Sequence, residues 1–61
     1  MNVYVFEHRS GHITEYVVQV MEDGILTDQK FYPTILEALV SGLHIALQNK
    51  AKLCIIDYIQ C

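Results

Sequence analysis

The segment Pro33–Lys50, PTILEALVSGLHIALQNK, decides the fold, because it is the one stretch whose pattern clearly predicts a helix. Thr34 and Glu37 have the spacing of a capping box, in which the hydroxyl accepts a hydrogen bond from the amide three residues on. Lys50 and Lys52 place positive charge near the negative end of the helix dipole. We therefore expect a helix that starts at Thr34 and ends close to Lys50.

Apolar side chains occupy two sides of this helix. At about 100° per residue, one stripe comprises Leu36, Leu39, Val40, Leu43 and Leu47, and we expect it to lie on a sheet. The second stripe, where a solvated helix would carry charge, comprises Ile35, Ala38, Gly42 and Ile45. It is a candidate partner surface. Gly42 costs about 1 kcal/mol relative to alanine in a helix, and either close packing on the sheet or a flat partner patch would explain it.

The segments on either side of the helix are predicted to be strands. Asn2–His8 and His12–Met21 are rich in β-branched and aromatic residues and form a hairpin. Ile25–Tyr32 follows an Asp-Gly turn and has a polar middle, which suits an edge strand or an extended loop. Leu53–Ile59 is almost continuously apolar, which favours a central strand. The expected fold class is α+β: one domain, residues 1–61, with a small antiparallel sheet of three to four strands in ββ(β)αβ order and one α-helix packed on one face.

Composition narrows the class of function. The chain has 61 residues, 52% of them hydrophobic, and such a short chain has excess apolar surface that a protein partner would cover. The net charge of -3 argues against nucleic-acid binding. No apolar run approaches the roughly 20 residues needed to span a bilayer. The first residues lack the pattern of an export signal, so we expect a cytoplasmic protein.

The two cysteines are seven positions apart in one predicted strand. Cys54 and Cys61 would then be roughly 23 Å apart at about 3.3 Å per residue, whereas a disulfide requires Cα atoms within about 7 Å. We therefore expect no bond between them, with Cys54 a small core residue and Cys61 a terminal thiol, unless the tail folds back.

No group of side chains has a spacing typical of catalysis. His8 and His12 flank the first turn, but two histidines are too few for a structural zinc site. Cys54 and His44 lack an orienting third group and an oxyanion hole. Phosphate loops and nucleophile elbows are missing from the sequence. We expect no enzymatic activity, no cofactor and no metal.

The turn Glu22-Asp23-Gly24, with Asp28 nearby, has two interpretations. Turns are often polar for structural reasons alone. Alternatively, the turn is a negative tip that enters a basic groove of another protein, where charge complementarity raises the association rate. Ile25 and Leu26 would then be its apolar anchor.

The chain resembles the Dmd antitoxin family of T4-like bacteriophages. The likeness runs through Thr14-Glu15, Val20-Met21, Glu22-Asp23, Glu37-Ala38-Leu39-Val40 and the ending Lys52-Leu53-Cys54-Ile55-Ile56-Asp57, which is similar to the family's Lys-Val-Cys-x-Val-Asp. The resemblance implies an antitoxin that inhibits a host mRNA endoribonuclease toxin of the RnlA or LsoA type by occupying its RNA-binding or active groove in the host cytoplasm. The second helix stripe would equally suit self-association, so a monomer and a weak homodimer both stay open. The family has a tryptophan associated with toxin contact, and Thr27 stands at that place here.

Two other resemblances remain open. Thr34-x-x-Glu37-Ala38-Leu39 is similar to the helix start of HicB antitoxins, although the Pro-Gly-Cys-like segment usual before that helix is missing. Small phage inhibitors of host RNA polymerase share the size and acidity of this chain. The complete set of predicted partner-binding residues is Glu22, Asp23, Ile25, Leu26, Thr27, Asp28, Ile35, Ala38, Gly42 and Ile45.

Overall fold

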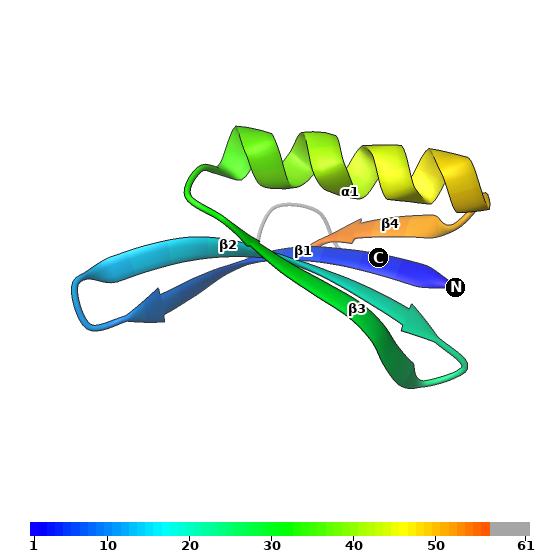
Figure 1. Ribbon diagram of the computed structural model, residues 1–61, viewed down its shortest axis with the longest axis horizontal. Helices are drawn as coiled ribbons and strands as arrows, with labels where there is room; N and C mark the ends of the chain where they lie inside the picture. The colour runs from blue at the N-terminus through cyan, green and yellow to red at the C-terminus, as the bar shows by residue number, and fades with distance from the viewer. Residues whose placement is uncertain (57–61) are drawn as a thin grey trace.

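The computed structural model describes residues 1–56 and contains four strands and one helix. Their bounds are β1 Asn2–Ser10, β2 Ile13–Glu22, β3 Ile25–Tyr32, α1 Ile35–Asn49 and β4 Lys52–Ile55. The strands form one sheet in the order β3-β2-β1-β4, and α1 lies over one face of it (Figure 1). The predicted α+β fold with one helix on a small sheet is confirmed.

The sheet is mixed, so the prediction of a purely antiparallel sheet is wrong. β1 pairs with β2 and β2 with β3 in antiparallel fashion, whereas β1 and β4 are parallel. The cause is α1, which carries the chain back along the sheet, so that β4 runs in the same direction as β3 and β1. β4 is an edge strand and not the central one expected of Leu53–Ile59, whose last residues lie outside the described part. β3 is the other edge, as predicted.

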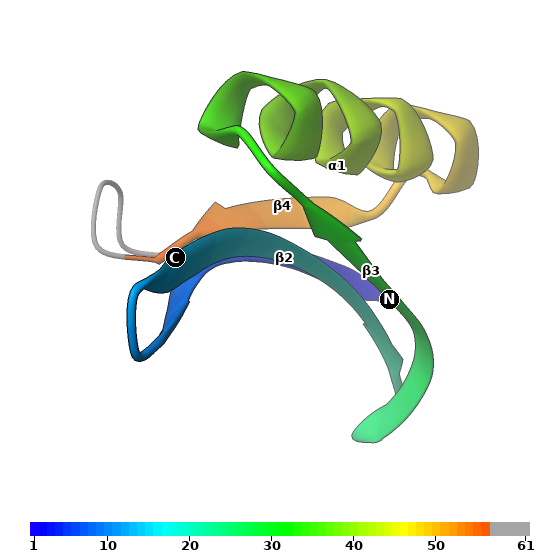
Figure 2. The same cartoon turned by 60° about the vertical axis from the view of Figure 1, so that its left-hand side comes forward.

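Both tight turns adopt the conformations that their sequences predict. Asp23 and Gly24 both have positive φ, 53° and 78°, which is the type I′ pattern that matches the twist of a hairpin. Gly11, at φ 62°, provides the residue with positive φ in the turn between β1 and β2. The ends of these hairpins curve away from the helix (Figure 2).

The core combines bulky residues of the sheet with small residues of the helix. The sheet residues buried in this core cluster are valines on the two central strands: Val3, Val5, Val18 and Val20. They meet Ala38 and Ala46 of α1, and Gly42 is also buried. β-Branched side chains fill the pleated surface, and the small helix residues let the helix backbone come close to them.

The two sides of the helix are therefore the reverse of the sequence prediction. Leu36 and Leu47 are 69% and 71% exposed, and Val40 and Leu43 are exposed as well. Of that stripe only Leu39 packs against the core. The supposed outer stripe faces the sheet: Ala38 and Gly42 are buried, and Ile35 and Ile45 are partly buried. The sequence prediction placed the larger apolar residues in the core because they are more hydrophobic. The space between the helix and the valines, however, is wide enough only for small residues.

Gly42 marks the closest approach of helix and sheet. A Cβ atom at this position would lie 2.8 Å from Val5 Cγ2 and 3.4 Å from Leu53 Cδ1. The first distance is shorter than real carbon contacts, and the fully buried Val5 has little freedom to move. The interpretation of Gly42 as a close-packing residue is confirmed.

We expect Gly42→Ala to destabilise the protein although alanine is the better helix former. The gain in helix propensity is about 1 kcal/mol, whereas overpacking a tight core costs about 1 to 3 kcal/mol. Urea unfolding followed by circular dichroism measures the difference. In a double-mutant cycle with Val5→Ala, the combined loss should be smaller than the sum of the single losses, because the clashing methyl group is gone. Additive losses would contradict the predicted clash.

Both ends of the helix are capped. Thr34 Oγ1 accepts a hydrogen bond from the Glu37 amide at 3.3 Å, as the capping-box spacing predicts. At the other end Lys50 adopts the left-handed conformation, φ 51°, and its amide donates to the Ala46 carbonyl. The Ala51 amide donates to the same carbonyl at 2.9 Å. This is a position that glycine usually occupies, and lysine is strained there.

Lys50→Gly should therefore stabilise the protein by about 1 kcal/mol. Thermal or urea unfolding of the variant gives the value. Gln48→Gly, inside the last turn of α1, is the matched control and should lose about 1 kcal/mol. Equal effects of the two glycines would show that the left-handed cap is not the cause.

Cys54 is buried and disulfide-bonded, so the expectation that it has no disulfide is wrong. The separation of roughly 23 Å assumed one extended strand through residue 61. β4 instead ends at Ile55, and Ile56 is in a turn. The Ile56 amide donates a hydrogen bond of 3.0 Å to the Val5 carbonyl. The prediction of a terminal thiol at Cys61 concerns a residue outside the described part.

Candidate partner-binding surfaces

The exposed side of α1 carries a row of apolar side chains, which we name the outer helix face: Leu36, Val40, Leu43 and Leu47. A helix presented to water normally carries charged residues here. The largest apolar patch of a monomer, on the order of a few hundred Å², is often its functional surface. The outer helix face is therefore the first candidate surface.

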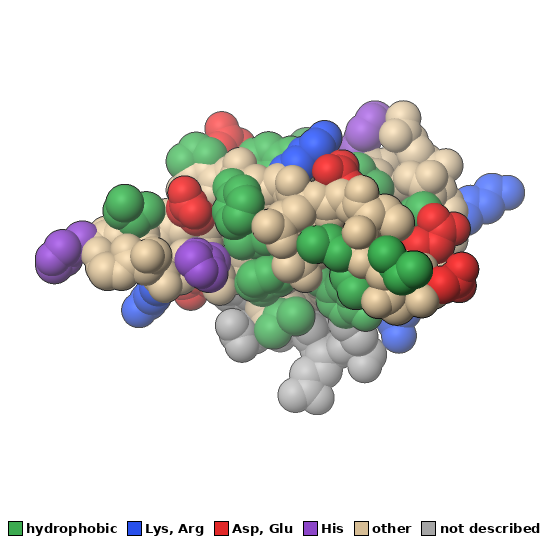
Figure 3. All heavy atoms as spheres, turned by 60° about the horizontal axis from the view of Figure 1, so that its bottom comes forward, with side chains coloured by type: hydrophobic (Ala, Val, Ile, Leu, Met, Phe, Trp, Pro, Cys, Tyr) green, Lys and Arg blue, Asp and Glu red, His purple; other side chains and the backbone are tan. Residues whose placement is uncertain are grey.

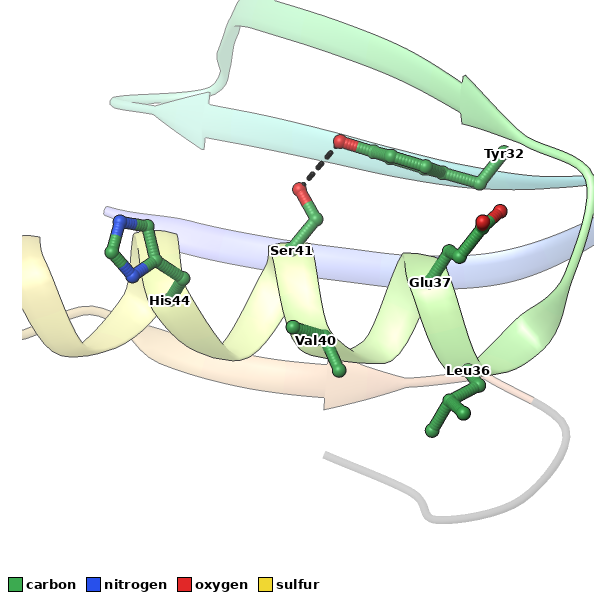
Figure 4. Close-up of a pocket in the computed structure, with 6 residues that line it drawn as sticks. All are labelled: Tyr32, Leu36, Glu37, Val40, Ser41 and His44. Carbon is green, nitrogen blue, oxygen red and sulfur yellow. Dashed lines mark hydrogen bonds between the residues drawn. The ribbon is translucent and has the colours of Figure 1, made fainter.

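A shallow hollow of about 660 Å³ lies beside the outer helix face. Its lining consists of the end of β3 and the part of α1 between Leu36 and His44: Tyr32, Leu36, Glu37, Val40, Ser41 and His44. Figure 4 shows Glu37, Ser41 and His44 on the side of the helix that Tyr32 approaches. The Tyr32 hydroxyl and Ser41 Oγ share a hydrogen bond of 2.6 Å, which ties β3 to the helix.

We expect Tyr32→Phe to lower the free energy of unfolding by about 1 kcal/mol, the usual net value of a partly buried hydrogen bond. Ser41→Ala removes the same bond but improves helix propensity, so its own effect is smaller. A double-mutant cycle by urea unfolding isolates the pair. A coupling energy near zero would show that the bond contributes nothing to stability.

The second candidate surface is the tip of the hairpin formed by β2 and β3. We name it the β2–β3 tip: Glu22, Asp23, Ile25, Leu26 and Asp28, all of them exposed. Ile25 is 67% exposed beside the two acidic residues of the turn. The tip thus presents negative charge and an apolar anchor together, on a strand pair whose backbone is hydrogen-bonded.

A β-bulge shapes this tip. Val20 pairs with Asp28 and Met21 with Leu26, so Thr27 is the extra residue. Its Oγ1 donates a hydrogen bond of 3.1 Å to the Val20 carbonyl. The resemblance placed Thr27 in the partner contact. In the structure its hydroxyl stabilises the bulge. A bulge changes the alternation of side chains along its strand.

Because of the bulge, Leu26 shares the sheet face opposite the helix with Phe31, which pairs with Val17. Figure 3 brings this face forward and shows apolar side chains over its middle and acidic side chains at the end where β2 and β3 meet. Leu26 and Phe31 are both exposed. The apolar part of the tip thus extends along the edge strand.

The structure brings together the predicted tip residues but separates them from the predicted helix residues. Ala38 and Gly42 are buried against the sheet, and Ile35 and Ile45 are partly buried, so these four predicted residues leave little surface for a partner. The outer helix face was missed in their place. The available signal was the contrast in size, since a stripe with Ala38, Gly42 and Ala46 suits close packing better than one of leucines.

The end of the β1–β2 hairpin carries polar residues that do not form a common site. His8 and His12 are exposed, and Arg9 Nε donates to Glu7 Oε1 at 2.9 Å, which raises the pKa of Arg9. Among residues 1–56, no three His, Cys, Asp or Glu side chains are grouped so that they could hold a metal ion. Within the same range, no helix is long and apolar enough to cross a membrane.

Comparison with known proteins gave no match to a family model, a curated protein or a solved structure. The candidate surfaces are therefore defined by the geometry of this chain.

Proposed function

We propose that this protein is a non-enzymatic phage antitoxin that binds a host mRNA endoribonuclease toxin of the RnlA or LsoA type in the host cytoplasm. The observation that carries the proposal is the β2–β3 tip, where Glu22 and Asp23 are exposed next to Ile25 and Leu26. The resemblance of the chain to the Dmd antitoxin family supports the identity of the partner.

The charge of the tip suits a groove that holds RNA. Such a groove is basic, and a protein with net charge -3 and two acidic residues at a projecting turn is drawn toward it. In this proposal the carboxylates of Glu22 and Asp23 take the place of RNA phosphate groups in the toxin groove. RNA and antitoxin then compete for the same basic side chains of the toxin.

Apolar anchors supply the rest of the affinity. Interfaces depend on a few well-packed side chains surrounded by contacts that exclude water. Ile25 and Leu26 are the large apolar residues of the tip. Ile25 is the more exposed of the two, so a partner can bury most of its side chain. A standard interface takes about 800 Å² from each protein, which is within reach of a hairpin with its adjoining edge strand.

The direct experiment mixes the purified protein with RnlA-type and LsoA-type toxins and follows RNA cleavage. We expect cleavage to stop at excess protein and a complex to elute together from a sizing column. Unchanged cleavage with no complex would refute the proposal. Affinity capture from host lysate then distinguishes the alternatives, because recovery of RNA polymerase subunits in place of a toxin would support the polymerase inhibitor.

Ile25→Ser and Asp28→Lys should weaken toxin binding while leaving the fold intact. Loss of a central anchor costs about 2 kcal/mol or more, roughly 30-fold in Kd. Isothermal titration gives the affinity and circular dichroism the fold. Ile13→Ser is a matched control, since Ile13 is 62% exposed at the opposite hairpin end. Equal weakening by the control would show that the tip is not the contact.

A further inference from the structure

We propose that the outer helix face is the interface of a homodimer, in which the α1 helices of two copies pack antiparallel across a two-fold axis. This goes beyond the proposed toxin contact, which uses the β2–β3 tip. In Figures 1 and 2 the helix lies on one face of the sheet and the tip curves away from it. The two surfaces can therefore be occupied independently.

The spacing of the apolar row is the first reason for a second copy. Leu36, Val40, Leu43 and Leu47 follow one another at intervals of four, three and four residues. This is the alternating seam of a coiled coil over two heptads. The row is also symmetric about its midpoint between Ser41 and Gly42. An antiparallel partner helix centred there places Leu36 opposite the partner's Leu47 and Val40 opposite the partner's Leu43.

Complementary hydrogen-bonding groups are the second reason. Glu37 and His44 lie on the same side of the row, where they line the hollow with Tyr32 (Figure 4). In the antiparallel pair, Glu37 falls about 3 Å along the axis from the partner's His44, given a rise of about 1.5 Å per residue. A ring N–H of His44 then donates to the carboxylate. The two-fold axis makes this contact twice.

Within one copy the same two side chains cannot meet. They are seven positions apart, roughly 10 Å along the helix, which is too far for a hydrogen bond between their side chains. Any energetic coupling between positions 37 and 44 therefore reports the dimer and not the folded monomer.

The area fits a specific but modest dimer. The four side chains of the outer helix face expose on the order of 400 Å², within the range of about 300 to 600 Å² of the largest apolar patch on a monomer, which is often functional. With the flanking polar residues of both copies, the interface comes close to the lower limit of about 1,000 Å² for specific association. An interface at this lower limit suits a weak association, in which monomer and dimer coexist.

Sedimentation equilibrium of the full chain over concentrations up to about 1 mM tests the proposal. We expect the mass to rise from that of one chain to that of two, and Val40→Lys to raise the dissociation constant by at least about tenfold. Ile13→Lys, an exposed apolar position far from α1, is the control and should leave dimerisation unchanged. A protein that stays monomeric throughout, or dimerises equally well with Val40→Lys, would overturn the proposal.

A charge exchange tests the antiparallel arrangement. Glu37→Lys and His44→Glu should each weaken the dimer several-fold, and the double variant should recover most of the loss, because the lysine then faces the glutamate of the partner. Circular dichroism confirms that each variant is folded. Losses that add in the double variant would contradict the antiparallel pairing. Val40→Lys should still inhibit the toxin, which keeps failure of the dimer distinct from failure of the antitoxin proposal.

Discussion

The close approach of α1 to the two central strands is the constraint on which the rest of the structure depends. Gly42 has no space for a Cβ atom beside Val5, and Ala38 and Ala46 are buried on the same side of the helix. Four valines fill the sheet face below them. Only small helix residues fit above such a surface, so the larger apolar residues of the helix must point away from the sheet.

This packing arrangement is what creates a candidate functional surface. A domain of this size has few positions to bury, and its core is filled by valine and alanine rather than by leucine. The leucines that remain form a regular row on the exposed side of α1. An exposed row with the spacing of a coiled coil is a surface for another helix, and the molecule itself offers a complementary one.

The β2–β3 tip follows from separate, local rules. Asp23 and Gly24 take positive φ, which closes the hairpin, and the bulge at Thr27 redirects the side chains beyond it. Turn chemistry thus holds the acidic residues and Ile25 in a fixed relation without help from the core. The helix and the tip can therefore serve different partners.

The sequence by itself determined the elements and most of their ends. Thr34 and Glu37 marked the start of the helix, Asp23-Gly24 marked a hairpin, and the polar middle of β3 marked an edge, because each of these depends on residues close together in the chain. Tertiary structure decided which side of the helix is buried, that β4 is a parallel edge strand, and that Cys54 is disulfide-bonded. These outcomes depend on the shape of the surface that each segment meets, and a helix that is apolar on two sides has no periodicity that can choose between them.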